Sequence, residues 1–311
     1  MEEVTKAFHG SPALRGVSFE VAYGEIFALL GPNGAGKTTT VEIAEGFIAP
    51  DSGRVMVAGL DPIRDRSELR LKVGVVLQQS ALERYLTVEE TIRMYASWYP
   101  RPLHPEELLK LVGLYEEKTK RVIRLSGGQL RRLEMALALV GDPEIVFLDE
   151  PTTGFDPAAR RTAWEAIRQL AALGKTIILT THYLEEAAQL ANRLAVLVAG
   201  QVVALDSPAG LISKKGRQAR VSFRKPPGDD PPMVGEFFQL EGDRVEFWSR
   251  SVTLDLAVLT SWALSRGLEL EELTVSRPSL EEVYLELVGA EGLAGAEEAV
   301  PATRSRRSRR R

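Results

Sequence analysis

The sequence predicts an α/β fold in which helices cover a mostly parallel sheet, with a small C-terminal α+β domain after it. Four short, nearly continuous apolar runs, as expected of strands buried on both faces, alternate with longer amphipathic stretches. The runs are Ile26–Leu30, Val73–Leu77, Ile145–Leu148 and Thr176–Leu179. A polar or glycine-rich cluster follows each run, and ligands of open α/β sheets bind beyond the carboxyl ends of the strands. We therefore expect the four clusters to converge in space.

Three segments complete the predicted domain organisation. Within a first domain of residues 1–215, residues of about 80–140 predict a helical insert, with helix starts at Thr87-Val-Glu-Glu90 and His104-Pro-Glu-Glu107. Residues 216–289 predict the small domain, in which two strands and a helix are expected. Their bounds are Val221–Arg224, Arg244–Trp248 and about Leu254–Arg266. Residues 290–311 have too little apolar content for a packed core and predict a disordered tail.

Composition excludes several classes of function. The chain has no cysteine, which removes disulfides, thiolate metal sites and a cysteine nucleophile. The net charge is −4, and six arginines lie between Arg304 and Arg311, so the rest of the chain carries −10. So acidic a body disfavours binding to nucleic acid. The tail either contacts anionic lipid headgroups or has no role.

Membrane spans are also not expected. No stretch approaches the ~18 consecutive apolar residues that a bilayer requires. Residues Met1 to Lys6 are charged where a signal peptide would be apolar. We expect a protein on the cytoplasmic side.

The cluster GPNGAGKTT follows the first strand and precedes a helix, which is the context of a phosphate-binding loop. Its candidate nucleotide-binding residues are Gly31, Pro32, Asn33, Gly34, Ala35, Gly36, Lys37, Thr38 and Thr39. Glycines let backbone N–H groups surround phosphates, and Lys37 adds a full positive charge. Thr38 is predicted to place its hydroxyl on Mg²⁺. The alternative is a glycine-rich turn with an unrelated lysine.

Two adjacent carboxylates, Asp149 and Glu150, follow the third strand. Successive strand residues point to opposite faces, so the two side chains are expected to separate. This arrangement predicts Asp149 as a Mg²⁺ ligand and Glu150 as the general base that activates water. An acidic turn is the alternative.

The segment Leu125-Ser-Gly-Gly-Gln129 resembles the signature motif of ABC ATPases, with Leu125, Ser126, Gly127, Gly128 and Gln129 in the motif positions. Physically it is a second helix start that can bind an anion, because Ser126 can cap and two glycines bare the backbone amides. The resemblance covers about residues 4–210. It implies a phosphate-loop NTPase fold of the ABC ATPase type, with a mostly parallel central sheet, an antiparallel β subdomain and a helical insert. It also implies a homodimer in which the signature motif contacts the ATP of the opposite protomer.

The resemblance assigns four further positions. Gln78 matches the glutamine that senses Mg²⁺, with Gln79 the weaker candidate, and Asp156 in Gly154-Phe-Asp156 matches the D-loop. His182 matches the histidine that contacts the γ-phosphate, against the alternative of a structural histidine. Phe8 matches the aromatic residue that stacks on adenine, with a core phenylalanine as the alternative.

Two flanking motifs resemble the drug-exporter branch similar to daunorubicin-resistance ATPases. They are Thr181-His-Tyr-Leu-Glu-Glu-Ala187 and Pro278-Ser-Leu-Glu-Glu-Val-Tyr-Leu285. The resemblance implies an ATPase that uses ATP and Mg²⁺, lies at the cytoplasmic face of the membrane and powers a separate transmembrane permease subunit. The cargo would be a drug, an antibiotic or a lipid-like compound. The main alternative is a soluble ABC ATPase without a membrane partner; a monomeric phosphate-loop kinase or GTPase leaves the signature motif unexplained.

Overall fold

The computed structural model describes residues 1–76, 82–214, 219–228, 230–276 and 279–297. Gln78, Gln79 and the arginine tail lie outside these residues. The chain divides into two compact units, Met1–Pro208 together with Leu287–Arg311, and Ala209–Glu286. Each unit has its own sheet and its own hydrophobic core.

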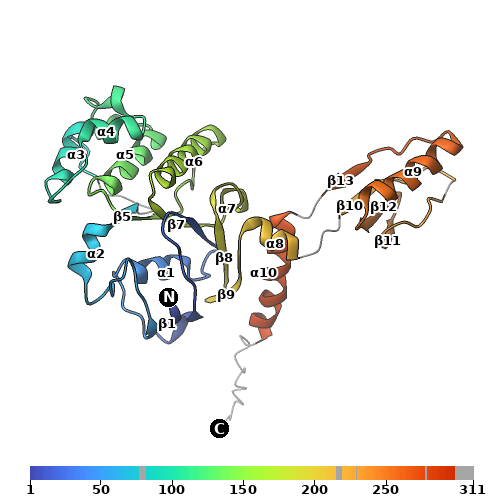
Figure 1. Cartoon of the computed structure of the whole chain (residues 1–311), viewed down its shortest axis with the longest axis horizontal. Coiled ribbons are helices and arrows are strands. Elements are labelled where there is room, and N and C mark those ends of the chain that lie inside the picture. The colour runs from blue at the N-terminus through green and yellow to red at the C-terminus, as the bar shows by residue number, and fades with distance from the viewer. Residues whose placement is uncertain (77–81, 215–218, 229, 277–278, 298–311) are drawn as a thin grey trace, which may run out of the picture. The chain divides into compact units, whose positions relative to one another are not determined.

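Six strands form the central sheet of the first unit, in the order β5-β6-β7-β3-β8-β9 (Figure 1). Their bounds are β3 Ile26–Leu30, β5 Val73–Val76, β6 Ile145–Asp149, β7 Thr176–Thr181, β8 Arg193–Val198 and β9 Gln201–Asp206. The first five strands in this order run parallel, and β9 pairs antiparallel with β8. All residues of β3 and β7 are buried, which explains their nearly unbroken apolar runs. The predicted mostly parallel sheet is confirmed.

Helices connect these strands and pack on the sheet. The helices are α1 Lys37–Ala44, α2 Arg66–Lys72, α6 Pro157–Ala172 and α7 Leu184–Leu190. Helix α1 contacts β6 and β7, while α6 packs on β7 and α7 on β3 and β7. The loop that enters α1 therefore lies beside the ends of the strands that carry the acidic pair and the histidine.

A smaller antiparallel sheet adjoins the central one. Its strands are β1 Glu2–Phe8, β2 Ser11–Val17 and β4 Ser52–Arg54, in the order β2-β1-β4. Val4 and Leu14 of this sheet belong to the same buried cluster as Phe27 and Phe147 of the central sheet. The antiparallel subdomain and the main sheet thus share one core.

The predicted helical insert is present between β5 and β6. Its elements are α3 Val88–Ala96, α4 Pro105–Leu111, the 3-10 turns η1 Tyr115–Glu117 and η2 Val122–Arg124, and α5 Gly127–Leu139. Thr87 caps α3 in a capping box with Glu90, and His104 caps α4 with Pro105 at the first helical position. Both predicted helix starts are confirmed.

The second unit is a four-stranded antiparallel sheet with a helix on it. Its elements are α8 Pro208–Lys214, β10 Ala219–Arg224, β11 Glu236–Glu241, β12 Arg244–Ser249, α9 Val252–Arg266 and β13 Thr274–Ser276, with strand order β11-β12-β10-β13. Phe223, Phe247 and Leu259 form its small core. The two expected strands and the helix are confirmed; β11 and β13 were not predicted.

One expectation at the C-terminus is wrong. Helix α10 spans Leu280–Glu297, so regular structure continues eight residues beyond Gly289. Three alanines, two glutamates and one leucine among residues 290–297 favour a helix, although Gly292 and Gly295 have low helix propensity. In the part of the chain that the structure describes, no helix is both long and apolar enough to cross a bilayer.

Candidate nucleotide-binding and catalytic site

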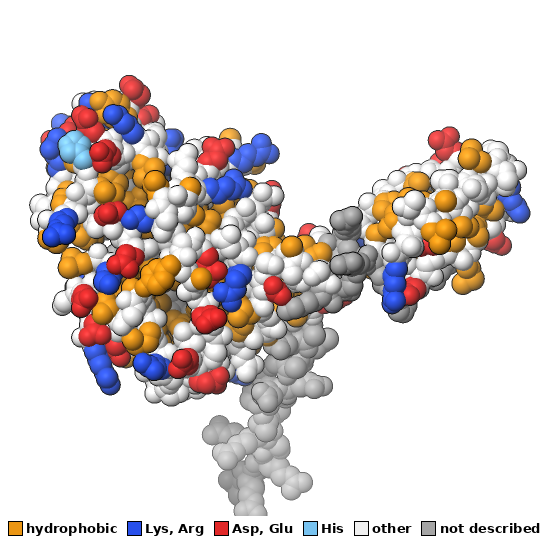
Figure 2. All heavy atoms as spheres, in the orientation of Figure 1, with side chains coloured by type: hydrophobic (Ala, Val, Ile, Leu, Met, Phe, Trp, Pro, Cys, Tyr) orange, Lys and Arg blue, Asp and Glu red, His pale blue; other side chains and the backbone are white. Residues whose placement is uncertain are grey.

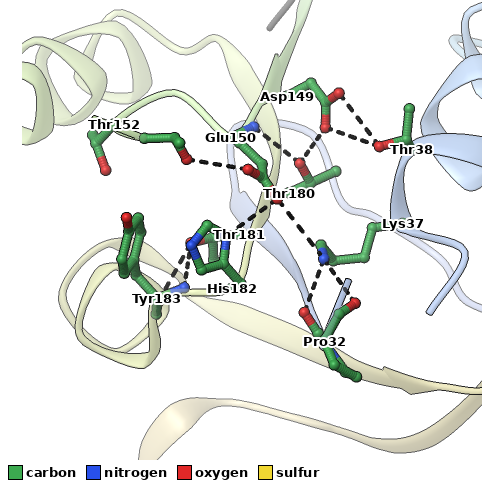
Figure 3. A network of polar contacts seen from close by, with 12 residues as sticks. Pro32, Lys37, Thr38, Asp149, Glu150, Thr152, Thr180, Thr181, His182 and Tyr183 are labelled. Atoms are coloured by element: carbon green, nitrogen blue, oxygen red, sulfur yellow. Dashed lines mark hydrogen bonds and ion pairs between the residues drawn. The ribbon is translucent and has the colours of Figure 1, made fainter. Parts of the chain in front are cut away.

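Three of the four polar clusters meet where the central strands end. In the parallel register Leu30 of β3 lies beside Thr181 of β7, and Asp149 of β6 lies beside Thr180 of β7. The phosphate loop, the acidic pair and the histidine follow these positions, so all three reach one edge of the sheet (Figure 3). The fourth cluster, with Gln78, lies outside the described residues.

The phosphate loop, residues 31–36, turns tightly between β3 and α1, and glycine is required at two of its positions. A Cβ atom on Gly31 would lie 2.3 Å from the carbonyl oxygen of Leu197. Gly36, the N-cap of α1, has φ 102°, and its Cβ would lie 2.7 Å from the carbonyl oxygen of Ala13. The loop residues Asn33 and Gly34 are exposed. Among the other predicted ATP ligands, Pro32 and Thr39 are half-buried and Ala35 is buried.

Lys37 is a buried cation at the start of α1, with 5% of its surface exposed. Its Nζ donates to the carbonyl oxygens of Gly31 at 2.8 Å and Pro32 at 3.1 Å, and lies 3.9 Å from Oε1 of Glu150. Burial lowers the pKa of the ammonium, while Glu150 and Asp149 raise it. Most of its hydrogen-bond partners are neutral carbonyls, so the positive charge is available to a bound anion.

Oxygen donors of the type that Mg²⁺ prefers lie next to this lysine. The hydroxyl of Thr38 is 3.4 and 3.5 Å from the two carboxylate oxygens of Asp149. Thr180 donates from Oγ1 to Oδ1 of Asp149 at 2.5 Å, which fixes the carboxylate rotamer. A threonine hydroxyl and one carboxylate, completed by water and phosphate oxygens, fit the way Mg²⁺ is held in nucleotide sites. Among the described residues no group of three His, Cys, Asp or Glu side chains could hold a metal by itself.

Glu150 projects away from Asp149 (Figure 3). The predicted separation is present, but strand alternation is not its cause, because β6 ends at Asp149 and Glu150 lies in the turn after it. Its backbone has φ 46°, the left-handed region, and its N–H donates to the carbonyl oxygen and Oγ1 of Thr180 at 3.2 and 3.0 Å. Thr153 donates to Oε2 at 3.1 Å, and Nδ1 of His182 lies 3.1 Å from Oε1. The carboxylate is therefore held at the rim of the site with only part of its surface exposed to solvent.

His182 follows β7 and faces Glu150 (Figure 3). The ring of His182 packs on the ring of Tyr183, with the two centroids 4.1 Å apart. The guanidinium of Arg160 lies over the Tyr183 ring, 4.6 Å from its centroid. Its side chain is partly exposed, so the histidine is not a core residue. Sequence reasoning gave no role to Thr180, although the motif Thr180-Thr-His182 contains it, and it bridges Asp149 to the backbone of Glu150.

The signature residues form a separate helix start. Ser126 is the N-cap of α5 and accepts from the N–H of Gln129 at 3.2 Å, while Oε1 of Gln129 accepts from the N–H of Ser126 at 3.1 Å. A Cβ on Gly127 would meet nothing within 4 Å. Among the described residues, Ser126 and Gly127 share no hydrogen bond or ion pair with the cluster around Lys37 and Glu150. The helix start is thus open and independent of this chain's own phosphate loop.

The remaining signature residues support this helix start. Leu125 precedes the cap, and a Cβ on Gly128 would contact only the Cβ of Ala159, at 3.9 Å. Gln129 also accepts from Lys120 at 3.0 Å and donates to Glu117 at 2.9 Å. Its amide is therefore occupied within its own subunit.

Two other predicted residues lie apart from the acidic pair. Asp156 caps α6, because its carboxylate accepts from the N–H groups of Ala158 and Ala159 at 2.9 and 2.8 Å. Phe8 ends β1 with 41% of its surface exposed, and the ammonium of Lys6 lies 5.7 Å from its ring centre. An exposed ring is not a core phenylalanine.

A buried carboxyl lies at the end of α1, behind the phosphate loop. Burial, together with the smaller effects of the Asp149 and Glu42 charges, raises the pKa of Glu45 to about 8. The pKa of Glu42 is also raised, first by burial and then by Asp149. A cation near Asp149 would offset part of this effect.

Comparison with known proteins follows the same division of the chain. A family model described as ABC transporter matches residues 14–153, and one described as the C-terminal domain of ABC transporter domain-containing proteins matches residues 219–279. The Nod factor export ATP-binding protein I of Rhizobium meliloti (strain 1021) is 38% identical over 298 residues, covering 93% of this chain and 87% of the relative. A daunorubicin resistance ATP-binding protein of Streptomyces coeruleorubidus is 35% identical, covering 91% of this chain and 93% of the relative.

Solved structures match about two thirds of the chain. The protein cbiO1 of Clostridium perfringens, part of an ABC transporter complex, aligns with a TM-score of 0.63 and 29% identity, over 69% of this chain and 90% of that protein. A dimeric ATP-binding cassette in a post-hydrolysis state with ADP and Pi aligns with a TM-score of 0.59 and 28% identity, over 66% and 97% of the two chains.

Proposed function

Because the chain belongs to the ABC transporter ATP-binding family and is an ATPase of that family, we propose that its hydrolysis of ATP powers a membrane exporter. The observation that carries the proposal is the convergence of Lys37, Asp149 and Glu150 at one edge of the central sheet. A kinase or GTPase site would share Lys37 and Asp149 but would leave the open helix start at Ser126 without a purpose. The family and the second helix start together favour the exporter.

Each residue of the site takes one role in hydrolysis. The loop amides and Lys37 bind the β- and γ-phosphates, and Phe8 stacks on the adenine. Thr38 and Asp149 hold Mg²⁺, which when bound neutralises the charge that develops on the phosphate oxygens. Gln78, outside the described residues, is proposed as a further Mg²⁺ ligand from its motif alone.

Glu150 acts as the general base toward the attacking water. Its Oε1 lies 3.9 Å from Nζ of Lys37 and 3.1 Å from Nδ1 of His182, so the carboxylate is near the position of the terminal phosphate. The N–H···O contacts to Thr180 hold its backbone in place. His182 orients the carboxylate and is positioned to contact the γ-phosphate.

A homodimer explains the second helix start. Gly127 and Gly128 stand in the first turn of α5, where backbone N–H groups have no partner within the helix, and Ser126 shares no hydrogen bond with this chain's own site among the described residues. We therefore propose that this helix start binds the ATP of a second protomer. Asp156 lies in the D-loop between the two sites. Dimeric cassettes among the similar solved structures support this arrangement.

A separate membrane subunit is the proposed partner, with the chain at the cytoplasmic face of the membrane. An open pocket of about 590 Å³ lies among α2, α3 and α5, and Phe47, Leu71 and Trp98 on its rim are exposed apolar side chains. Such side chains around a hollow favour a protein partner over solvent. On the face that Figure 2 shows, acidic and basic side chains are interspersed, without a continuous basic surface for nucleic acid.

The cargo class follows from the relatives. Proteins named for Nod factor export and for daunorubicin resistance are similar along more than nine tenths of this chain. We therefore propose a drug-like, antibiotic or lipid-like cargo. Contact between the arginine tail and anionic lipid stays a prediction from the sequence, because the tail lies outside the described residues.

Two measurements test the proposal. Glu150→Gln should bind Mg-ATP but hydrolyse it about 10²–10⁴-fold more slowly than the wild type, since only the base is lost. The wild-type protein, expressed in its own cells, should fractionate with a membrane complex after detergent solubilisation. Recovery only as a soluble protein, with ATPase activity intact, would favour a soluble ABC ATPase.

A further inference from the structure

A buried arginine joins the signature helix to the backbone on both sides of Glu150. Arg131 lies in α5 with 7% of its surface exposed. Its Nη2 donates to the carbonyl oxygen of Asp149 at 3.2 Å, and its Nε donates to the carbonyl oxygen of Pro151, also at 3.2 Å. One rigid guanidinium therefore grips the residues immediately before and after Glu150.

This grip matters because Glu150 holds an unfavourable backbone conformation. A non-glycine residue at φ 46° is strained, and this conformation persists only where the surrounding structure fixes it. From one side Thr180 fixes the N–H of Glu150. From the other side Arg131 fixes the two flanking carbonyls, so the strained turn that aims the carboxylate is held by contacts from two elements.

Arg131 also forms an ion pair within its own helix. Its Nη1 donates to Oε2 of Glu134, one turn further along α5, at 2.9 Å. Because Glu134 belongs to the same helix, the ion pair stays within α5, whereas the two carbonyl contacts reach the catalytic segment. A lysine could keep the ion pair but could not span both carbonyls, since it has a single nitrogen in place of a planar fork.

Helix α5 links this grip to the dimer interface of the proposed function. Ser126, its N-cap, and Arg131 are five residues apart, about 7.5 Å along the helix axis at 1.5 Å per residue. Over so short a distance a helix moves as one rigid piece. A phosphate that displaced the helix start would therefore also displace Arg131, which contacts the turn at Glu150.

We infer that Arg131 is a positioning residue for the general base Glu150, acting from the helix that meets the partner's nucleotide. The inference rests on the proposed function, because it takes Glu150 as the base and Ser126 as the contact to the second ATP. It predicts that weakening the grip on the carbonyls slows hydrolysis without weakening the binding of ATP.

The experiment is a double-mutant cycle on the full chain, with wild type, Arg131→Lys, Glu150→Gln and the double variant, all measured at saturating Mg-ATP. Arg131→Lys should lower kcat about 10²-fold, the scale of loss for a misplaced catalytic group, with KM for ATP within about twofold of wild type. In the Glu150→Gln background the same change should alter the residual rate less than about twofold, since no base is left to position. A merely structural role would slow both backgrounds equally and would overturn the inference.

Two control variants separate the carbonyl contacts from other effects. Glu134→Gln removes the ion pair but leaves both carbonyl contacts, and should keep kcat within about threefold; a loss as large as that of Arg131→Lys would overturn the inference. Arg168→Lys alters an exposed arginine of α6 that donates to the carbonyl oxygen of Gln189 at 3.3 Å, away from Glu150, and should be neutral. If Arg131→Lys does not fold, Arg131→Gln replaces it, because its amide still reaches one carbonyl.

The outcomes also separate this inference from the proposed function. A Glu150→Gln variant that hydrolyses ATP at the wild-type rate would contradict the role of Glu150 itself. A slow Glu150→Gln variant together with an unimpaired Arg131→Lys variant would contradict only the role of Arg131.

Discussion

Nδ1 of His182 lies 3.1 Å from Oε1 of Glu150, so the residue after β7 directly contacts the carboxylate that follows β6. Removing the imidazole frees the carboxylate to rotate and removes a group from the γ-phosphate position. We expect His182→Ala to lower kcat about 10²-fold with nucleotide affinity little changed, because Lys37 and the loop amides are intact. Steady-state ATPase assays and ATP titration measure the two effects. His9→Asn is the control, since His9 is exposed at a turn with φ 50°, which asparagine tolerates.

Replacing Phe8 measures how much stacking on adenine contributes to the affinity for ATP. Stacking of a base on an aromatic ring contributes about 1–3 kcal/mol, so Phe8→Ala should weaken ATP binding about tenfold or more. Because the ring is 41% exposed, the melting temperature should change little. Tyr23→Ala, at an exposed aromatic outside the site, should leave ATP affinity unaltered. Lower stability with unchanged affinity would show that Phe8 serves the fold.

The raised pKa of Glu45 predicts how the stability of the folded protein depends on pH. Burial raises the pKa of its carboxyl to about 8 in the folded protein, against 4.5 for the ordinary value. Between these two values the folded state binds the proton more tightly than the unfolded state, so this residue's contribution to stability falls as pH rises from about 4.5 to 8. Glu45→Gln keeps the shape of the side chain but cannot become charged. The loss of stability between about pH 4.5 and 8 should therefore be smaller in this variant.

At pH 8 we therefore expect Glu45→Gln to melt at least about 2 °C above the wild type, the shift that roughly 1 kcal/mol produces in a domain of this size. At pH 5 the two proteins should melt within about 1 °C of each other. Differential scanning calorimetry at both values tests this. Glu68→Gln, at an exposed position of α2, is the control and should show no such difference. A Glu45→Gln variant that is less stable at pH 8 would contradict a buried, protonated carboxyl.

Trp98 tests the proposed contact with the membrane subunit. Its side chain is 62% exposed at the rim of the pocket among α2, α3 and α5 and packs on Tyr95, with the ring centroids 4.5 Å apart. Trp98→Ser should reduce co-purification with the membrane complex about tenfold or more, as expected for an aromatic anchor at the centre of an interface. ATPase activity of the purified chain should stay within about twofold. Leu173→Ser, an exposed apolar residue after α6, should not affect co-purification.

Burial explains part of what the sequence predicts and misses, although β8 was missed with five of its six residues buried. β3 and β7 are buried throughout and appear as apolar runs, whereas β4 and β13 are three-residue strands with every residue exposed. Such edge strands form because a neighbouring strand offers hydrogen bonds, not because their own side chains require burial. Helix α10 was not predicted, and its last eight residues were assigned to the tail, since composition alone distinguishes poorly between a helix and a disordered tail.

The site also contains residues that the sequence predicts and residues that it misses. Lys37, Glu150 and His182 stand in contiguous motifs next to predicted strands, so the sequence brings them together once the strands are placed side by side. The roles of Thr180 and Arg131 depend on which backbone groups they reach, and those groups are 30 and about 20 positions away along the chain. Local patterns carry no information on such contacts.

The last prediction concerns the dimer that the open helix start implies. In the Glu150→Gln variant ATP is bound but hardly hydrolysed, so two chains should stay joined through their nucleotides. Adding Ser126→Arg places bulk and a side chain at the amides that would face the partner's phosphate, and the cap of α5 is lost as well. The double variant should remain monomeric at saturating Mg-ATP, while each chain still binds ATP through Lys37. Analytical ultracentrifugation with and without ATP measures this, and ATP titration confirms binding. A Glu150→Gln protein that stays monomeric with ATP, or a double variant that dimerises equally well, would exclude a shared site.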